Sequence, residues 1–450
     1  MKSDMTQGKI FPLLMKFTLP MMVGDLFQQF YNIVDTIIVG RTLGANALAA
    51  VGSTGTIMFL TVGFCTAMAN GLGVVTAQRF GAKDEAGVRS SFSNGIYLIA
   101  LVSAVLSCFF LLFTRRLLTL MNTPEDIFEY AVSYISVIFA GLAVTAFYNY
   151  FAANLRAIGN SRVPLYFLIF ASGLNIVLDL AFIILMGMGV AGAALATILS
   201  QLISVLLCVT YIMMKEPVLQ PKGSDWKLHS GILRQQLEIG LPMAIQNSIT
   251  SSGTIIMQSA TNIFGSTAVA AVTASTKCRT LFSVIMISMG NGVATFVGQN
   301  YGANNLKRVK EGVYTAVKVM TVYAIAAGFI AYALLPLEIR LFISDASEIE
   351  AMMPWARITM LTAALFLVPL SYIFIFRSAL QACGKSVFAM SAGLVELASR
   401  IIFAWIAIHY QIFVCAVLCD SAAWFSAGVF TCVSFIIIIK RLQKEAGQLS

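Results

Sequence analysis

The chain has 450 residues, of which 59% are hydrophobic and only 11% carry a charge. So few charges cannot cover the surface of a water-soluble protein of this length, which excludes a soluble globular protein. The net charge of +9 at pH 7 therefore indicates contact with anionic lipid rather than with nucleic acid.

Apolar segments of about 20 residues recur along the chain, and this is the pattern of transmembrane helices. The N-terminal stretch "GKIFPLLMKFTLP" runs straight into the first of them and lacks the layout of a cleavable signal. The predicted fold class is an all-α integral membrane protein. In chain order we expect twelve spans, at residues 11–39, 50–75, 90–113, 128–153, 164–186, 191–214, 236–262, 272–297, 312–335, 352–380, 387–408 and 412–439.

The distribution of Lys and Arg predicts the orientation of these spans. If both termini are cytoplasmic, 19 of the 29 basic residues flank cytoplasmic helix ends and 5 lie on the opposite side. We therefore expect a multi-pass protein of a bacterial-type cytoplasmic (inner) membrane, with both termini in the cytoplasm.

The sequence also contains an internal repeat. The stretch "ANGLGVVTAQRFGA" at 69–82 recurs as "GNGVATFVGQNYGA" at 290–303. Further along, "LRAIGNS" at 155–161 recurs as "LQACGKS" at 380–386. Matched blocks in one order are not explained by shared apolar composition, so the chain consists of two related halves.

We expect an N-terminal six-helix lobe at 1–214, a cytoplasmic linker at 215–235 and a C-terminal six-helix lobe at 236–450. The linker is too short to be a domain. Because each half has an even number of spans, the lobes are parallel repeats, and this is a transporter architecture.

The motifs "YNIVDTIIVG", "LGANALAAVG", "LNIVLD" and "RAIGN", together with the paired elements ending "AQRFGA" and "GQNYGA", follow in a fixed order. In this order they resemble the multidrug and toxic compound extrusion (MATE) family, closer to its DinF-like branch. The resemblance covers nearly the whole chain, roughly residues 10–440. It implies a secondary transporter that exports drug-like compounds.

Motifs typical of nucleotide binding, catalysis or metal binding occur here without the neighbouring residues or elements that those functions require. "GMGVAG" at 187–192 fits a dinucleotide fingerprint but joins two membrane spans. The two histidines, His229 and His409, have no acid or cysteine partner evident in the sequence, and the cysteines form no metal-binding pattern. We therefore expect no enzyme, no cofactor and no metal centre.

Ionisable residues inside membrane spans are costly and are candidates for function. Asp35, Asp179 and Thr197 all lie about 9–12 Å below the predicted outer surface, at 1.5 Å per helical residue. They can meet if their helices are neighbours. Asn175 lies one turn from Asp179 on the same helical face.

Two further polar stripes follow helical spacing. Gln28 and Tyr31 share a face with Asp35, and Gln201 lies one turn after Thr197. We treat Gln28 and Gln201, together with Glu396 and Arg400 of the second half, as candidate substrate or secondary polar contacts.

The resemblance adds roles for these positions. It implies a cation or proton site whose residues match Asp35, Asn175, Asp179 and Thr197. These four residues would also hold Na⁺ if Na⁺ is the coupling ion. Tyr31 matches a polar neighbour of that site, and Pro20 matches a proline at which the first helix bends.

Asp35 has two interpretations. A carboxyl group in a low dielectric beside a second carboxyl group binds a proton more readily than one in water, which suits a proton carrier. The alternative is a structural carboxylate bound to helix ends or to an arginine, although Arg41 lies about 240° round the helix. We favour the proton carrier.

The second half does not copy this site. The repeat mates of Asp35 are Ile256 or Met257, and Asn175 maps onto Arg400. Glu396 and Arg400 are one turn apart, and we interpret them as a structural ion pair rather than a coupling site. Asp420 and Asp25 have no evident partner.

We expect a secondary antiporter that exports lipophilic or cationic compounds in exchange for H⁺ or Na⁺ by alternating access. Its partners would be small drug-like substrates and membrane lipid, with no nucleic acid and no obligate protein partner. One alternative is a lipid-linked glycan flippase of the same superfamily, which would need a cationic cavity. For such a cavity the second half offers only Lys277, Arg279, Arg377 and Arg400. A membrane-embedded enzyme is a more distant alternative.

Overall fold

The computed structural model describes residues 4–342 and 346–447, and helices account for nearly all of them. In chain order the helices are α1 (Ile10–Leu43), α2 (Ala45–Gly81), α3 (Glu85–Leu120), α4 (Glu125–Ala140), α5 (Leu142–Ala157), α6 (Arg162–Asp179), η1 (Leu180–Leu185), α7 (Gly189–Lys215), η2 (Pro217–Leu219), η3 (Gly223–Trp226), α8 (Ser230–Asn262), α9 (Ser266–Gly302), α10 (Leu306–Phe342), α11 (Ala346–Leu365), α12 (Leu367–Ala382), α13 (Ser386–Tyr410) and α14 (Phe413–Glu445). The predicted all-α membrane fold is confirmed.

Each predicted span corresponds to a helix or to a pair of helices, and two spans are broken. The span predicted at 128–153 is α4 and α5, which meet at Gly141 with a bend of 46°. A Cβ on Gly141 would lie 2.4 Å from the side chain of Ile198, so glycine lets α7 approach the bend. The span predicted at 352–380 is α11 and α12, which bend by 45° at Phe366. Pro369 lies in the first turn of α12, where its missing N–H is compatible with a helix start.

Hydropathy within the described residues supports nine single spans, or eleven when each bent pair counts as one. The helix that fails this test is α8, which covers the span predicted at 236–262. It carries polar side chains on several successive turns, so its composition is unlike that of a lipid-facing helix.

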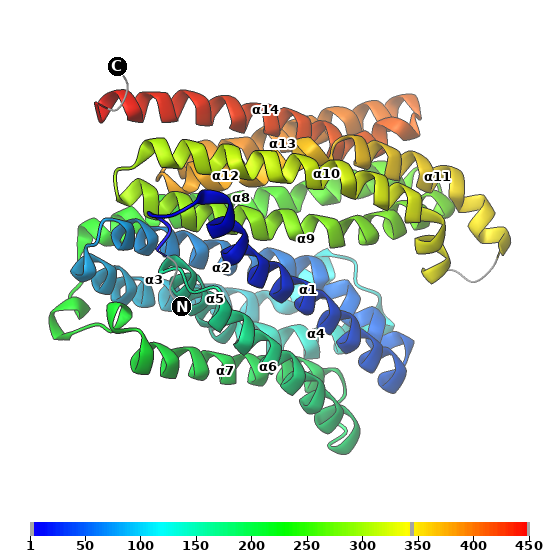
Figure 1. The fold of residues 1–450 in the computed structure, drawn as a ribbon. Helices are drawn as coiled ribbons and strands as arrows, with labels where there is room; N and C mark the ends of the chain where they lie inside the picture. Colours follow the sequence, from blue (N-terminus) through cyan, green and yellow to red (C-terminus); the bar gives the residue numbers. More distant parts are fainter. Residues whose placement is uncertain (1–3, 343–345, 448–450) are drawn as a thin grey trace. The chain divides into compact units, whose positions relative to one another are not determined.

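By its internal contacts the chain forms two compact units. Unit 1 contains Leu19–Ala244, and unit 2 contains Met5–Thr18 and the chain from Ile245 onward. The core of unit 1 joins α2, α3, α5 and α7 through buried side chains that include Met68, Phe92, Tyr150 and Cys208. In unit 2, α9 to α14 run alongside one another, and α10 and α11 pack through Leu335 and Met360 (Figure 1).

The repeat reappears as local backbone geometry. The turn after α2 has Lys83 at φ 58°, and the turn after α9 has Asn304 at φ 55°. In the first turn Asp84 accepts a hydrogen bond from the Gly87 N–H at 2.9 Å, and in the second Asn305 accepts one from the Arg308 N–H at 3.1 Å. Both are side-chain N-caps at the same point of the repeat, and they fix the start of α3 and α10.

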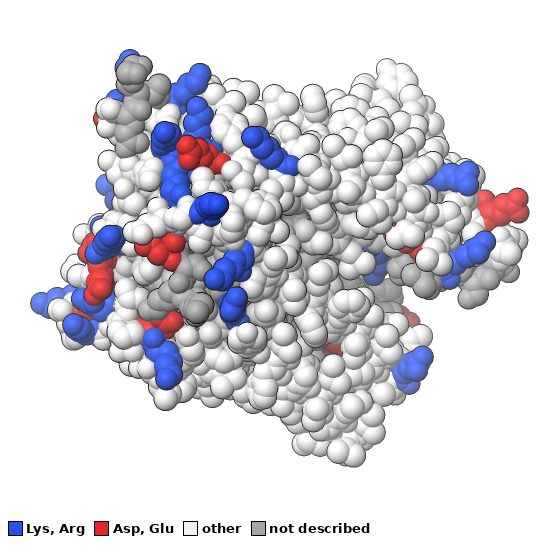
Figure 2. All heavy atoms as spheres, viewed as in Figure 1, with Lys and Arg blue, Asp and Glu red and all other residues white. Residues whose placement is uncertain are grey.

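Charged side chains gather near the helix ends on the face shown in Figure 2, and a broad band without them lies between. Large apolar side chains are exposed in unit 1, among them Phe30 at 65% and Leu112 at 80%. An apolar band of this kind matches the hydrocarbon layer of a membrane.

Part of the predicted linker is held against α3 within unit 1. Arg89 Nε lies 2.9 Å from Asp225 Oδ2, and the backbone N–H of Lys222 donates to the same oxygen at 2.8 Å. Asn94 donates to the Lys227 carbonyl and accepts from the His229 N–H. The link is therefore an ordered part of unit 1 over these residues.

Low pH should weaken the contact that Asp225 makes with Arg89 and Lys222. Burial works against the Asp225 carboxylate, but its hydrogen bonds from Lys222 and Arg89 outweigh burial and hold the pKa of Asp225 below its usual value. A lowered folded-state pKa stabilises the fold above the unfolded pKa of about 4, and this stability is lost as pH falls through the folded pKa. We expect Asp225→Asn to cost about 2 kcal/mol at pH 7 and progressively less as pH falls below about 4.

The measurement is the free energy of unfolding of wild type and Asp225→Asn as a function of pH. Glu238→Gln is the control, because its pair with Arg234 is exposed and should contribute less than about 0.5 kcal/mol. A difference between wild type and Asp225→Asn that is the same at pH 7 and pH 3 would contradict the assignment.

Candidate functional site

Two acidic side chains meet in unit 1. Asp35 lies on α1, Asp179 is the last residue of α6, and their carboxyl groups are within hydrogen-bonding reach of each other. Asp179 is fully buried, and Asp35 is half-buried. The Asp35 Oδ1 atom is buried without a hydrogen bond among the described residues. Two carboxyl groups at this separation are stable when they share a proton or a cation between them.

Asn175 and Thr197 adjoin this acid pair. Asn175 is buried one turn before Asp179, and its Nδ2 atom lies 3.5 Å from Thr197 Oγ1. Thr197 Oγ1 also donates to the Ala193 carbonyl of its own helix at 3.1 Å, which leaves its lone pairs as acceptors. The structure therefore brings the four residues of the predicted coupling site together on α1, α6 and α7.

The backbone changes its winding beside the acid pair. The α-helix α6 ends at Asp179 and continues as the π-helix η1 over the next six residues. π-helical turns are rare in proteins as a whole, but those that occur are often found at functional sites. This change rotates Asp179 relative to the residues that follow it, and no sequence pattern predicted it.

Two tyrosines complete the surroundings. Tyr31 lies one turn before Asp35 and is within electrostatic range of both acids. Tyr134 on α4 is 5% exposed and lies within range of Asp35, Tyr31 and Asp179. Sequence reasoning missed Tyr134, because one tyrosine in an apolar run does not differ from ordinary membrane-helix composition.

The structure shows no contact between the acid pair and the three remaining predicted residues, Gln28, Gln201 and Pro20, within the described part of the chain. Gln28 is exposed on α1, and Gln201 accepts a hydrogen bond from Thr145. Pro20 lies inside α1, which continues as one helix from Ile10 to Leu43.

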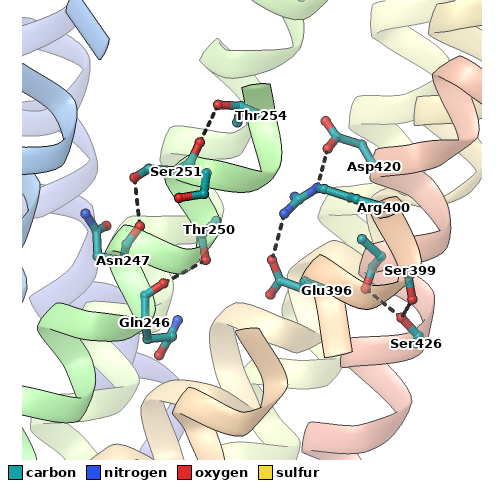
Figure 3. A network of polar contacts seen from close by, with 12 residues as sticks. Gln246, Asn247, Thr250, Ser251, Thr254, Glu396, Ser399, Arg400, Asp420 and Ser426 are labelled. Carbon is teal, nitrogen blue, oxygen red and sulfur yellow. Dashed lines mark hydrogen bonds and ion pairs between the residues drawn. The ribbon is translucent and has the colours of Figure 1, made fainter. Parts of the chain in front are cut away.

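Unit 2 contains a buried cluster of charged side chains. Arg400 Nε lies 3.0 Å from Asp420 Oδ1, and its Nη1 lies 3.6 Å from Glu396 Oε2 (Figure 3). Arg279 Nη2 lies 3.3 Å from the second oxygen of Asp420, and Arg377 Nη1 lies 3.3 Å from the second oxygen of Glu396. We call these five residues the arginine cluster.

The arginine cluster extends one sequence interpretation. The pair of Glu396 and Arg400 exists, but it is one link in a chain of ion pairs across α9, α12, α13 and α14. Asp420, for which the sequence offered no partner, binds two arginines. Asp25, the other acid without an evident partner, lies within electrostatic range of Arg156.

The polar side of α8 faces the cluster. Figure 3 shows Glu396 and Arg400 pointing toward the segment of α8 that carries Thr250 and Ser251. Thr250 donates to the Gln246 carbonyl at 3.1 Å, and Ser251 donates to the Asn247 carbonyl at 2.7 Å. Both hydroxyl groups are satisfied within α8, on the segment toward which Glu396 and Arg400 point. This explains why α8 is too polar to pass as a lipid-facing span.

The fold and the buried charges define a polytopic membrane transporter with polar groups in the interior of each unit. The chain matches the MatE family model over residues 20–181 and 242–406. It belongs to the MATE family of multidrug efflux transporters, and it is a transporter rather than an enzyme.

Curated relatives agree with this assignment. The chain is 31% identical over 308 residues to the probable multidrug resistance protein YpnP of Bacillus subtilis (strain 168), covering 68% of each chain. It is 24% identical over 382 residues to the multidrug export protein MepA of Staphylococcus aureus (strain NCTC 8325 / PS 47), covering 84% of this chain and 83% of that one.

Solved structures share the fold. A crystal structure of a MATE in the bent conformation superposes with a TM-score of 0.91 at 23% identity, covering 98% of both chains. A MOP superfamily transporter from Pyrococcus furiosus superposes with a TM-score of 0.92 at 23% identity and the same coverage. The description of that second protein states that reverse polarity of its binding pocket suggests a different function.

Proposed function

We propose that this transporter is an antiporter that exports lipophilic, often cationic, compounds in exchange for H⁺ or Na⁺ by alternating access. The observation that carries the proposal is the contact between Asp35 and Asp179 inside unit 1. A buried acid pair can exchange a cation in a fixed stoichiometry, which a channel or a scaffold does not need.

In this proposal Asp35 and Asp179 hold the coupling ion, and Asn175 and Thr197 orient it through their amide and hydroxyl groups. Loading the ion from outside would change the surroundings of α1, in which Pro20 is a point of weakness because it lacks a backbone donor. Substrate and ion would then occupy unit 1 in turn. The protein would act in a bacterial cytoplasmic membrane with both termini inside.

Transport into proteoliposomes tests the coupling. With ethidium as the substrate, we expect an imposed pH gradient or an imposed Na⁺ gradient, applied separately, to drive uptake at least tenfold above the rate without a gradient. The Asp35→Asn protein at equal reconstitution is the matched control, and it should show only the background rate. Uptake that is equal with and without both gradients would contradict ion-coupled antiport.

A second candidate has one observation in its favour. A flippase for lipid-linked glycans needs cationic groups near its substrate path, and three of the four basic residues that the sequence offered form the arginine cluster. The acid pair of unit 1 favours the antiporter.

A further inference from the structure

The linker between the two halves is held on unit 1 at several points. Leu219 is fully buried in the core that joins α2, α3, α5 and α7. The Gln220 amide donates to the carbonyls of Ile212 and Met213 at 3.1 Å and 2.7 Å, which fastens the linker to the end of α7. Together with the bond between Asp225 and α3, these contacts give the exposed side chains of the linker fixed positions.

Three carbonyl groups of the linker face α3. Ser93, Asn94 and Tyr97 donate hydrogen bonds to the carbonyls of residues 225–227. The ring of Trp226 stays 41% exposed and meets the Tyr97 ring edge to face, with 6.1 Å between the ring centroids. The indole is therefore fixed through its backbone and open to contact with another molecule.

Trp226 lies at the end of a lipid-facing stripe on α3. Tyr97, Leu101 and Val105 follow one another at intervals of four residues, so they share one face of this membrane span, and all three are exposed. Exposed apolar side chains on a membrane span face the hydrocarbon layer. Tyr97 is the member of the stripe nearest the linker, and tyrosine and tryptophan gather where the hydrocarbon meets the lipid headgroups. The linker beside Tyr97 therefore lies at the level of the headgroups.

The exposed charges of the linker are positive. Lys215, Lys222 and Lys227 are exposed, whereas the two acids of the linker are buried. Asp225 lies within electrostatic range of Lys222, but its carboxylate is already bound by α3. Glu216 accepts hydrogen bonds from two neighbouring side chains. An anionic group outside the protein therefore meets ammonium groups at this surface.

We propose that the linker docks on anionic phospholipid headgroups through Lys215, Lys222, Trp226 and Lys227, which we call the linker face. Each lysine pairs with a headgroup phosphate, and the Trp226 ring packs among the glycerol groups and the upper acyl chains. Charge selects the lipid, because a phosphatidylcholine headgroup carries its own ammonium group and gains less from the lysines. The linker face is separate from the acid pair on which the transport proposal rests.

Quenching of Trp226 by spin-labelled lipid tests the proposal. The full-length protein is placed in phosphatidylcholine nanodiscs that contain a small, equal share of labelled phosphatidylglycerol or labelled phosphatidylcholine, with the nitroxide near the top of one acyl chain. The quenching of Trp226, one of 4 tryptophans, is the difference between wild type and Trp226→Phe. Each lysine near an anionic lipid surface favours that surface roughly fivefold. We therefore expect labelled phosphatidylglycerol to associate at least tenfold more strongly than labelled phosphatidylcholine.

A triple variant with Lys215→Gln, Lys222→Gln and Lys227→Gln removes the charge of the linker face. Because all three side chains are exposed, it should unfold at the same temperature as wild type in phosphatidylcholine nanodiscs. Its preference for labelled phosphatidylglycerol should fall to about twofold, and Lys227→Gln alone should give an intermediate value. The matched control carries glutamine at three exposed lysines of unit 2: Lys307, Lys440 and Lys444. It should keep the full preference.

Other results would overturn the proposal. Equal quenching by the two labelled lipids in wild type means that the linker face does not select anionic lipid. A preference that survives in the linker variant, or that is lost equally in the unit 2 variant, means that the overall charge of the protein attracts the lipid. A preference that dissolved glycerol 3-phosphate abolishes means that the surface takes a free phosphate compound. Uptake of ethidium is measured separately, so failure of either experiment leaves the other proposal standing.

Discussion

Asp35→Asn should abolish drug efflux while the protein still inserts into the membrane. Asparagine keeps the size of aspartate and its capacity to accept a hydrogen bond from Asp179, but it can neither release a proton nor supply negative charge to Na⁺. We expect efflux of ethidium from cells to fall at least a hundredfold, to the level of cells without the transporter. The measurement is the efflux rate at matched amounts of protein in isolated membranes.

Two further variants make this test specific. Asp126→Asn removes an exposed carboxylate at the start of α4 and should leave efflux unchanged. The double variant Asp35→Asn with Asp179→Asn should be no worse than the single variant, because residues that act as one unit are not additive. Near-normal efflux by a well-expressed Asp35→Asn protein would defeat the assignment of Asp35 as the ion carrier.

The length of the apolar runs predicted the helices well. A membrane span must make all its backbone hydrogen bonds internally across a hydrocarbon layer of fixed thickness, so each span is a long apolar helix. The same signal could not locate the breaks at Gly141 and Phe366, because a kink leaves the run of apolar residues unchanged. It also counted α8 as an ordinary span, whereas the helix carries polar side chains that face the arginine cluster.

Helical spacing predicted which polar residues share a face, and depth predicted which could meet. Asn175 and Asp179 could be paired from their spacing alone. Their contact with Asp35 depends on α1 and α6 being neighbours, which depth suggests but does not establish. Tyr134 comes from a fourth helix, and no local pattern marks it.

The sequence predicted fewer of the polar contacts in unit 2, again because most of them join residues that are far apart in the chain. Glu396 and Arg400 were visible because they are one turn apart. The contacts that Asp420 makes with Arg279 and Arg400 join residues 141 and 20 positions apart in the chain. Such pairings follow from tertiary packing, which a periodicity argument cannot reach. The excess positive charge of the arginine cluster, which has three guanidinium groups and two carboxylates, became visible only when all five side chains were placed together.

That excess makes Glu396 the most sensitive member of the arginine cluster. Glu396→Gln would raise the cluster's net charge from +1 to +2 and remove the carboxylate between Arg377 and Arg400. Removing one partner of a buried ion pair typically costs about 3–5 kcal/mol. Arg400→Gln should cost much less, because Glu396 keeps Arg377 and Asp420 keeps Arg279. We expect Glu396→Gln to lower the free energy of unfolding by about 3–5 kcal/mol, measured by SDS titration of the protein in mixed micelles.

The double variant Glu396→Gln with Arg400→Gln decides whether charge balance is the cause. It returns the cluster to +1, so it should recover at least half of the stability lost in Glu396→Gln. The exposed pair of Arg441 and Glu445 provides the matched control, and its double glutamine variant should change stability by less than about 0.5 kcal/mol. If Arg400→Gln proves more destabilising than Glu396→Gln, Arg400 holds the cluster together through its packing against α8 at Gly253. In that case the balance of charge would not govern the stability of unit 2.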